Sequence, residues 1–191
     1  MLDSDVRAAL HARLRSLHAR ELGSTRFVDE LGVAGEVRID TAVLNGSFAG
    51  YEIKSASDTL RRLPKQVEVY SKVVDYATLV VAENHVSHAL GAVPSWWGLV
   101  IASTNRSGGV RLRRARQGHR NRRIEPEWLV RLLWKDETLA ALETLGAAHG
   151  MRGKPLPALH TALVDHLGTD ELRTLVRESL KSRTKWRAVT P

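Results

Sequence analysis

Apolar residues near the start of the chain recur at a helical spacing. Val6, Leu10, Leu14 and Leu17 lie three or four residues apart, with charged residues between them. Side chains at this spacing share one face of a helix. The pattern therefore predicts an amphipathic helix over residues 5–20.

A hairpin signal follows this helix. Residues 37–44 and 48–54 are rich in β-forming side chains and are separated by Asn45-Gly46-Ser47. Asn-Gly favours a tight turn between antiparallel strands. Pairing around this turn would bring Asp40 near Glu52, although sequence alone does not determine the register.

The next segment alternates helical and extended patterns. Residues 59–74 predict a helix capped by Ser57 or Asp58, in which Pro64 requires a kink or a late start. Further strands are expected at 77–82, 98–102 and 110–113, with a short helix at 84–89. A strand hairpin followed by alternating helices and strands indicates an α/β fold.

The pattern changes after Pro126. Helical spacing dominates from there on, over residues 128–134, 137–145, 156–167 and 170–180. We therefore expect an α/β core over residues 1–124 and a helical C-terminal subdomain over residues 125–191. A length of 191 residues suits one compact domain with an appended small one.

Composition excludes several kinds of chemistry. The chain has no cysteine, which excludes disulfides, thiolate zinc sites and cysteine nucleophiles. Its acidic N-terminus is not a secretory signal, and no apolar run is long enough to cross a membrane. We expect a cytoplasmic protein that does not associate with membranes.

Positive charge is concentrated in one segment. The net charge is +8, and eight arginines lie between residues 103 and 124 with no acid among them: Arg106, Arg111, Arg113, Arg114, Arg116, Arg120, Arg122 and Arg123. Clustered guanidinium groups bind phosphates with release of counterions. The segment predicts contact with nucleic acid, and a solvated basic surface or an acidic partner is the alternative reading.

The hairpin carries residues suited to phosphodiester hydrolysis. Asp40 and Glu52 offer the oxygen ligands that Mg²⁺ or Mn²⁺ requires, and the carbonyl of Ile53 could add another. Lys54 lies two residues after Glu52 on a strand, so both side chains share a face. Its ammonium could stabilise negative charge on the phosphate or orient the attacking water.

These residues resemble a known motif. Asp40, Glu52, Ile53 and Lys54 resemble the metal-binding core of the PD-(D/E)XK nucleases, and Gln66 to Tyr70 resembles the QxxxY element of RecB-like and Cas4-like members. The surrounding residues, and stretches as far as 132–137, are similar to the bacterial sce7726 family. The proline that often precedes the first acid is replaced by Ile39.

The resemblance implies roles for individual residues. Asp40, Glu52 and the Ile53 carbonyl would bind metal, and Lys54 would be the catalytic lysine. Gln66 and Tyr70 would face the active site or the nucleic-acid backbone. An acid from the first part of the chain would complete the metal site, with Glu30 as first candidate and Glu21 and Glu36 as rivals. The implied fold is a restriction-endonuclease-like mixed sheet flanked by helices.

The sequence thus predicts a Mg²⁺- or Mn²⁺-dependent nuclease that hydrolyses DNA. It does not distinguish DNA from RNA, and it leaves open whether a second copy or a partner protein takes part. The main alternative is a non-catalytic nucleic-acid-binding module that retains the nuclease fold. A third is a protein-interaction adaptor that uses the helical C-terminus.

Overall fold

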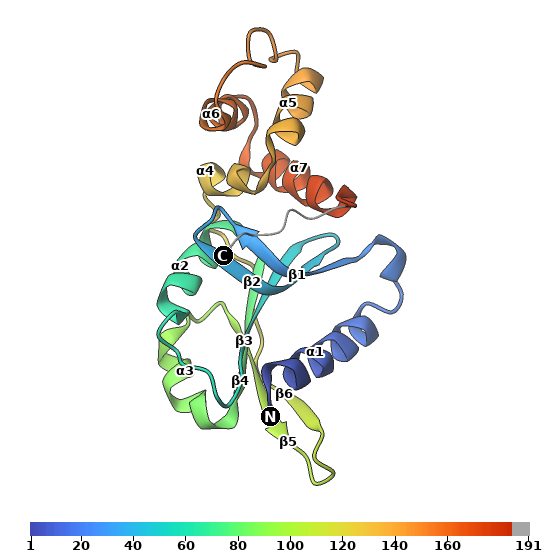
Figure 1. Ribbon diagram of the computed structural model, residues 1–191, viewed down its shortest axis with the longest axis vertical. Helices are drawn as coiled ribbons and strands as arrows, with labels where there is room; N and C mark the ends of the chain where they lie inside the picture. The colour runs from blue at the N-terminus through green and yellow to red at the C-terminus, as the bar shows by residue number, and fades with distance from the viewer. Residues whose placement is uncertain (185–191) are drawn as a thin grey trace.

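A six-stranded mixed sheet forms the centre of the protein in the computed structural model, which describes residues 1–184. The strands lie in sequence order across the sheet (Figure 1). They are β1 (Arg26–Val33), β2 (Val37–Leu44), β3 (Phe48–Lys54), β4 (Tyr76–Ala82), β5 (Gly98–Thr104) and β6 (Val110–Arg116). β3, β4 and β5 are parallel, and the other neighbours are antiparallel. The predicted mixed α/β fold is confirmed.

Helices flank this sheet on both sides and continue beyond it. They are α1 (Asp3–Leu17), α2 (Leu63–Val73), α3 (Val86–Ala92), α4 (Pro126–Leu129), α5 (Lys135–Thr144), α6 (Leu156–His166) and α7 (Thr169–Ser182). Short 3₁₀ turns are η1 (Leu22–Ser24), η2 (Glu83–His85) and η3 (Val130–Leu132). The four segments expected to be helical after Pro126 all contain helix, although 128–134 divides into α4 and η3.

Each face of the sheet has its own hydrophobic layer. Val6, Leu10 and Leu14 of α1 pack against one face, which includes Ile53 and Val80. Helices α2 and α3 lie on the opposite side from α1 (Figure 1). Burial of such apolar faces is the main stabilising term of the fold. Because successive side chains of a strand point to opposite faces, β3 contributes residues to both hydrophobic layers.

Helix α2 begins later than the sequence pattern suggested. The prediction of a helix from Thr59 is wrong, because the helix starts at Leu63 with Pro64 in its first turn. Proline fits there, since the first helical N–H groups have no partner within the helix. Asp58 does not cap α2. Its carboxylate accepts from the Ser55 N–H at 2.7 Å and so closes the turn after β3.

Strand β1 was not expected from the sequence. It pairs with β2 along its length, but Glu30 has a φ of 58°, in the left-handed region. The pairing passes from Asp29↔Thr41 to Leu31↔Ile39 without Glu30. The register is the same on both sides of Glu30, so the irregularity is a local backbone distortion opposite Asp40 and not a bulge. It lies beside Asp40.

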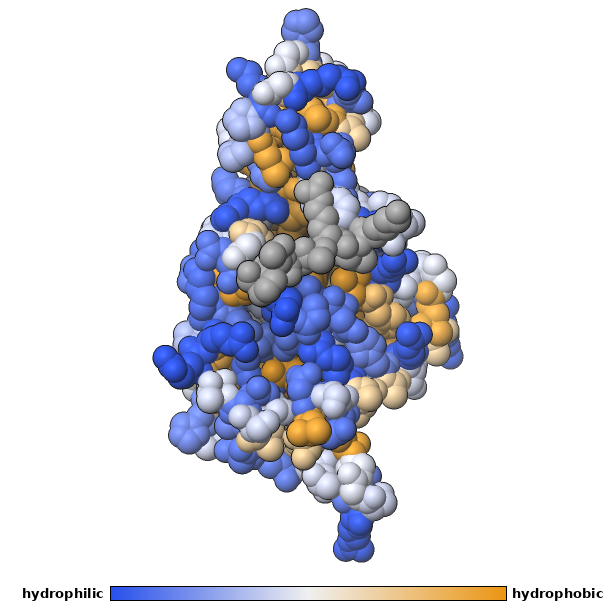
Figure 2. Space-filling model, viewed as in Figure 1, coloured by the Kyte–Doolittle hydropathy of each residue, from blue (hydrophilic) through white to orange (hydrophobic). Residues whose placement is uncertain are grey.

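The C-terminal helices are tied to the sheet through one shared hydrophobic cluster, which runs from Leu79 and Trp97 to Leu163 and Val176. Arg183 donates to Glu137 and, at 2.7 Å, to the Leu132 carbonyl, and so fastens the end of α7. In the space-filling view, hydrophilic side chains dominate the visible face, with hydrophobic ones between the C-terminal helices (Figure 2). The boundary predicted at residue 124 stays a prediction.

None of the helices within residues 1–184 has the length and apolar character needed to span a bilayer.

Candidate functional site

Asp40, Glu52 and Lys54 come together at the end of the hairpin. The antiparallel register pairs Thr41 with Tyr51, which makes Asp40 and Glu52 neighbours on adjoining strands. One Asp40 carboxylate oxygen accepts from the Ile53 N–H at 2.7 Å. The Lys54 ammonium lies 2.6 Å from Glu52 Oε1. The predicted convergence of these groups is present.

Helix α2 adds two polar side chains to the same place. The Tyr70 hydroxyl donates to Glu52 Oε2 at 2.6 Å and lies 3.2 Å from the Arg38 carbonyl. Burial, followed by the negative charge of Glu52, raises the pKa of Tyr70 well above its usual value, so the hydroxyl stays a donor. Tyr70 also stacks on Trp97, with ring centroids 5.5 Å apart. It therefore supports the core and the site together.

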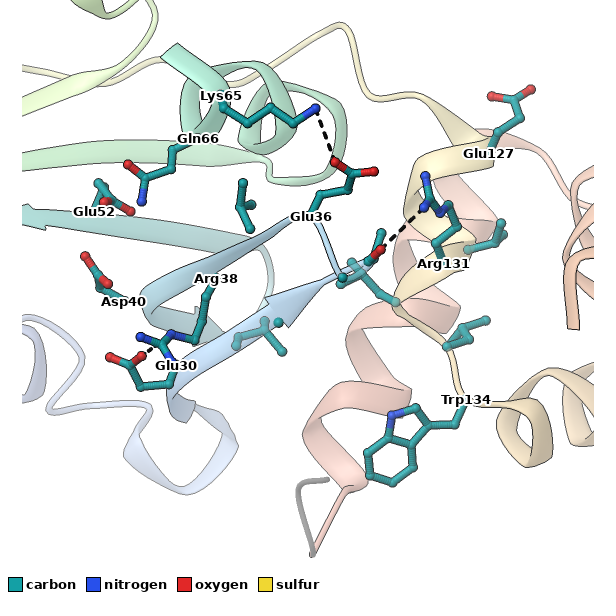
Figure 3. A pocket seen from close by; sticks show the side chains of 18 of the residues that line it. Glu30, Glu36, Arg38, Asp40, Glu52, Lys65, Gln66, Glu127, Arg131 and Trp134 are labelled. Atoms are coloured by element: carbon teal, nitrogen blue, oxygen red, sulfur yellow. Dashed lines mark hydrogen bonds and ion pairs between the residues drawn. The ribbon is translucent and has the colours of Figure 1, made fainter. Parts of the chain in front are cut away.

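Gln66, one turn before Tyr70, is only 7% exposed, yet its amide oxygen has no hydrogen-bond partner among the described residues. It faces the cavity that contains Asp40 and Glu52 (Figure 3). A buried polar atom without a partner is costly and is typical of a group that awaits a ligand or a water.

The surroundings of Asp40 favour its protonated form. Burial raises the pKa of Asp40 to about 7, and repulsion from Glu52 adds to the effect. The Ile53 N–H, Arg7 and Lys54 oppose the rise. A cation placed between the two acids would favour the ionised form of Asp40.

The three candidates for an additional acid lie in different places. Glu30 lines the cavity and pairs with Arg7 and Arg38. Glu36 also lines it, but pairs with Lys65 at 3.3 Å. The third, Glu21, pairs with His18 after α1 and is absent from the cavity lining. Of these acids only Glu30 belongs to the cluster that includes Asp40.

A cavity of about 1490 Å³ contains the whole arrangement. One wall consists of the β1–β2 hairpin, the end of β3 and the start of α2, and the other consists of η3, α6 and their neighbours (Figure 3). Arg131 and Trp134 belong to this second wall, as do Leu156, His160 and Val164. The C-terminal helices therefore contribute directly to the cavity that contains the acids.

The eight clustered arginines do not form one surface beside the acids. None of them lines the cavity. Register places Arg113 opposite Ile101, which pairs with Val81, which in turn pairs with Lys54. Three strand spacings separate Arg113 from Lys54, or about 14 Å.

Other members of this arginine segment serve the fold or lie elsewhere. Arg116 donates to the carbonyls of Trp97 at 2.8 Å and Pro94 at 3.1 Å. Arg120, Arg122 and Arg123 flank Asn121, whose amide is bonded to the carbonyls at the end of α2. The arginine segment therefore does not line the cavity, and its contact with nucleic acid stays a prediction.

The positive side chains that do line the cavity come from elsewhere in the chain: Arg7, Arg38, Lys54, Arg62, Lys65, Arg131 and Arg183. Arg38 precedes Asp40 by two residues on β2, so strand alternation could have indicated it. Arg7 lies 33 residues before Asp40, and nothing in the sequence connects the two.

The donor set is suited to a hard divalent ion with an incomplete protein shell. Residues 1–184 contain no group of three His, Cys, Asp or Glu side chains placed to hold a metal. Two carboxylates and a carbonyl remain, from Asp40, Glu52 and Ile53. Mg²⁺ is commonly held by one or two carboxylates, with water and substrate oxygens completing its octahedron. The residues present therefore fit such an ion.

Comparison with solved structures gives weak likenesses. A protein of unknown function from Silicibacter pomeroyi, SPO1766, is 23% identical, with a TM-score of 0.43 over 75% of this chain and 92% of that one. SfsA of Pyrococcus furiosus, in complex with Ca²⁺, is 13% identical, with a TM-score of 0.38 over 60% and 64%. Likenesses at this level establish neither the site nor its activity.

Comparison of sequences gives a clearer result. Protein cII of Enterobacteria phage P4 is 28% identical over 167 residues, which cover 85% of this chain but only 61% of that protein. The PD-(D/E)XK and sce7726 resemblances stay predictions, because the matching family model is a different one. The model for bacteriophage P4 protein cII matches residues 3–188, and the chain therefore belongs to the P4 cII family.

Proposed function

We propose that the protein is a metal-dependent nuclease that hydrolyses phosphodiester bonds in DNA. The observation that carries the proposal is the convergence of Asp40, Glu52 and Lys54 in one cavity, with Lys54 Nζ 2.6 Å from Glu52. The unpaired Gln66 amide in the same cavity supports it. These groups match the requirements of phosphodiester hydrolysis, and the resemblance to PD-(D/E)XK nucleases rests on the same residues.

Asp40, Glu52 and the Ile53 carbonyl would hold Mg²⁺ or Mn²⁺. The bound ion would supply charge relief at the phosphate and a more acidic water. Lys54 is held against Glu52 and can neutralise negative charge that develops on the phosphate. Tyr70 fixes the second oxygen of Glu52 and so orients that carboxylate. The unpaired amide oxygen of Gln66 can accept a hydrogen bond from a water in the cavity.

A test is the nicking of supercoiled plasmid in Mg²⁺ or Mn²⁺. We expect the wild type to nick the plasmid, EDTA to stop it, and Asp40→Ala to remove it. Asp165→Ala is the matched control, because Asp165 lines the opposite wall of the same cavity and contacts none of the proposed catalytic groups. Cleavage that survives Asp40→Ala would contradict the proposal, since it would come from another site or a contaminant.

The second candidate is a nucleic-acid-binding module without catalysis. It is favoured by one observation: both oxygens of Glu52 already have partners, Lys54 and Tyr70. A metal would have to compete for this carboxylate. Equal and negligible nicking by the wild type, Asp40→Ala and Lys54→Ala in both metals, with retained DNA binding, would favour the binding module.

A further inference from the structure

Two arginines converge on one carboxylate inside the cavity. The Arg7 guanidinium contacts Glu30 Oε1 at 2.9 Å, and the Arg38 guanidinium pairs with Glu30 Oε2. Figure 3 shows Arg38 and Glu30 joined beside Asp40. The three side chains come from α1, β2 and β1, and all of them line the cavity of the proposed metal site.

The backbone at Glu30 is held in an unfavourable conformation. Its φ of 58° is uncommon for a residue other than glycine, asparagine or aspartate. The ladder between β1 and β2 omits it. Strain of this kind persists only where the surroundings impose it, and it gathers at ligand-binding sites. A surface ion pair does not require such a backbone conformation, so the conformation of Glu30 indicates a role in ligand binding.

We propose that Arg7 and Arg38 form a phosphate-binding site for a nucleic-acid strand, and that Glu30 occupies it as an internal anion when no strand is bound. The inference deepens the proposed nuclease function, which identifies the strand as the ligand. Carboxylates and phosphates present similar oxygens to a guanidinium group, so either can fill the same site.

Exposure allows one anion to replace the other. The side chains of Glu30 and Arg38 are 39% and 55% exposed, and ion pairs in water are held weakly. A phosphodiester presents two charged oxygens, as a carboxylate does, and can bridge both arginines in the same way. Its arrival would release the Glu30 carboxylate close to Asp40, where the family resemblance implies an additional metal ligand.

Arg7 remains in place when Glu30 leaves. Its guanidinium also donates to the Asp40 carbonyl at 2.5 Å and to Asp3 at 3.2 Å. These contacts fix it from the side of α1. Arg38 is anchored through its backbone, because its carbonyl lies 3.2 Å from the Tyr70 hydroxyl. The Arg7 half of the site therefore exists before the ligand arrives, which reduces the cost of binding.

The test measures the affinity for a fluorescent single-stranded oligonucleotide by anisotropy, in EDTA at low salt, so that no cleavage occurs. We expect Arg38→Ala to weaken binding roughly 3- to 10-fold and Glu30→Gln to tighten it by a similar factor. Glu30→Asp keeps the charge and suits the left-handed backbone, but its carboxylate is shorter and reaches Arg38 less well. We expect it to tighten binding about 3-fold.

Glu36→Gln is the matched control. Glu36 lines the same cavity and loses the same charge, but it pairs with Lys65 instead of the two arginines. We expect a change below about 2-fold. The inference would be overturned if Glu30→Gln and Glu36→Gln tightened binding equally and Glu30→Asp bound with wild-type affinity. The loss of one negative charge at long range would then account for the change in affinity. The inference would also be overturned if Arg38→Ala weakened the binding of inorganic phosphate but left the affinity for the oligonucleotide unchanged.

The two proposals fail in different ways. If the variants change binding as expected while the wild type nicks no plasmid in Mg²⁺ or Mn²⁺, the phosphate site stands and the nuclease function falls. If the wild type nicks plasmid while Arg38 and Glu30 variants bind as it does, the nuclease function stands and the inference falls.

Discussion

Two segments stand out in the sequence, residues 38–70 and residues 106–123. The fold brings the polar side chains of the first together and disperses those of the second. The first carries Asp40, Glu52 and Lys54, which line one cavity, and Tyr70, which is buried behind them and bonded to Glu52. The second carries eight arginines, which the fold distributes over the turn before the edge strand β6, the strand itself and the connection after it. Nearness in sequence therefore predicts nearness in space only when pairing and packing enforce it.

The physical reason is the kind of contact in each segment. Antiparallel pairing of β2 and β3 places the acids on adjacent strands, and the packing of α2 on the same face adds Tyr70. The arginine segment has no such constraint, because β6 pairs on one side only and alternates its side chains between two faces. Charge repulsion also favours separation of like groups.

The largest expected difference between the segments is in cleavage. Lys54→Ala should reduce plasmid nicking on the order of 100-fold or more, because it removes charge next to the proposed metal ligands. The double variant Arg111→Ala, Arg113→Ala removes two charges from β6. It should leave the maximal rate within about 3-fold and act on the Michaelis constant. A comparable loss of maximal rate in both variants would contradict the separation of the two regions.

The contribution of the Tyr70 hydroxyl to the first segment can be measured as a change in unfolding free energy. Tyr70→Phe leaves Glu52 Oε2 buried without its donor, and we expect a loss of about 1–3 kcal/mol of unfolding free energy. Urea denaturation measures it. Tyr76→Phe is the control, because the Tyr76 hydroxyl makes no hydrogen bond within residues 1–184. Similar losses in both variants would show that the Glu52 contact contributes nothing specific.

The pH dependence of the metal-free protein tests the acid pair. The folded pKa of Asp40 is about 7 against 3.8 for the free side chain, so the folded state binds a proton that the unfolded state releases. Stability should therefore fall as pH rises from 4 to 7 and then level off. In EDTA, Asp40→Asn should raise the thermal midpoint by roughly 3 °C or more at pH 8 and by little at pH 4. Identical shifts at both pH values would contradict the raised pKa.

The smallest expected effect is a difference in stability between variants of two arginines in the basic segment. Arg116→Ala removes two hydrogen bonds to backbone carbonyls and should cost about 1–2 kcal/mol of unfolding free energy. Arg113 is exposed, and Arg113→Ala should change stability by less than about 0.5 kcal/mol. Chemical denaturation of both variants checks the difference. Equal stabilities would mean that Arg116 contributes only charge.

Much of the sheet was predictable from the chain. The hairpin around Asn45-Gly46, the buried strands β4 and β5, and the helical C-terminal part all follow from local signals. The failures also have local causes. Strand β1 was missed because Asp29 and Glu30 interrupt its apolar pattern, and α2 starts late because of Pro64.

The sequence by itself determined the residue types of the proposed chemistry and the hairpin whose two strands carry Asp40 and Glu52, and the structure supplied the register that makes them neighbours. Only the tertiary structure decided their surroundings. Arg7 from α1 and Arg38 converge on Glu30, and the C-terminal helices close the cavity. Such contacts depend on how distant elements pack, and no periodicity in the chain encodes them.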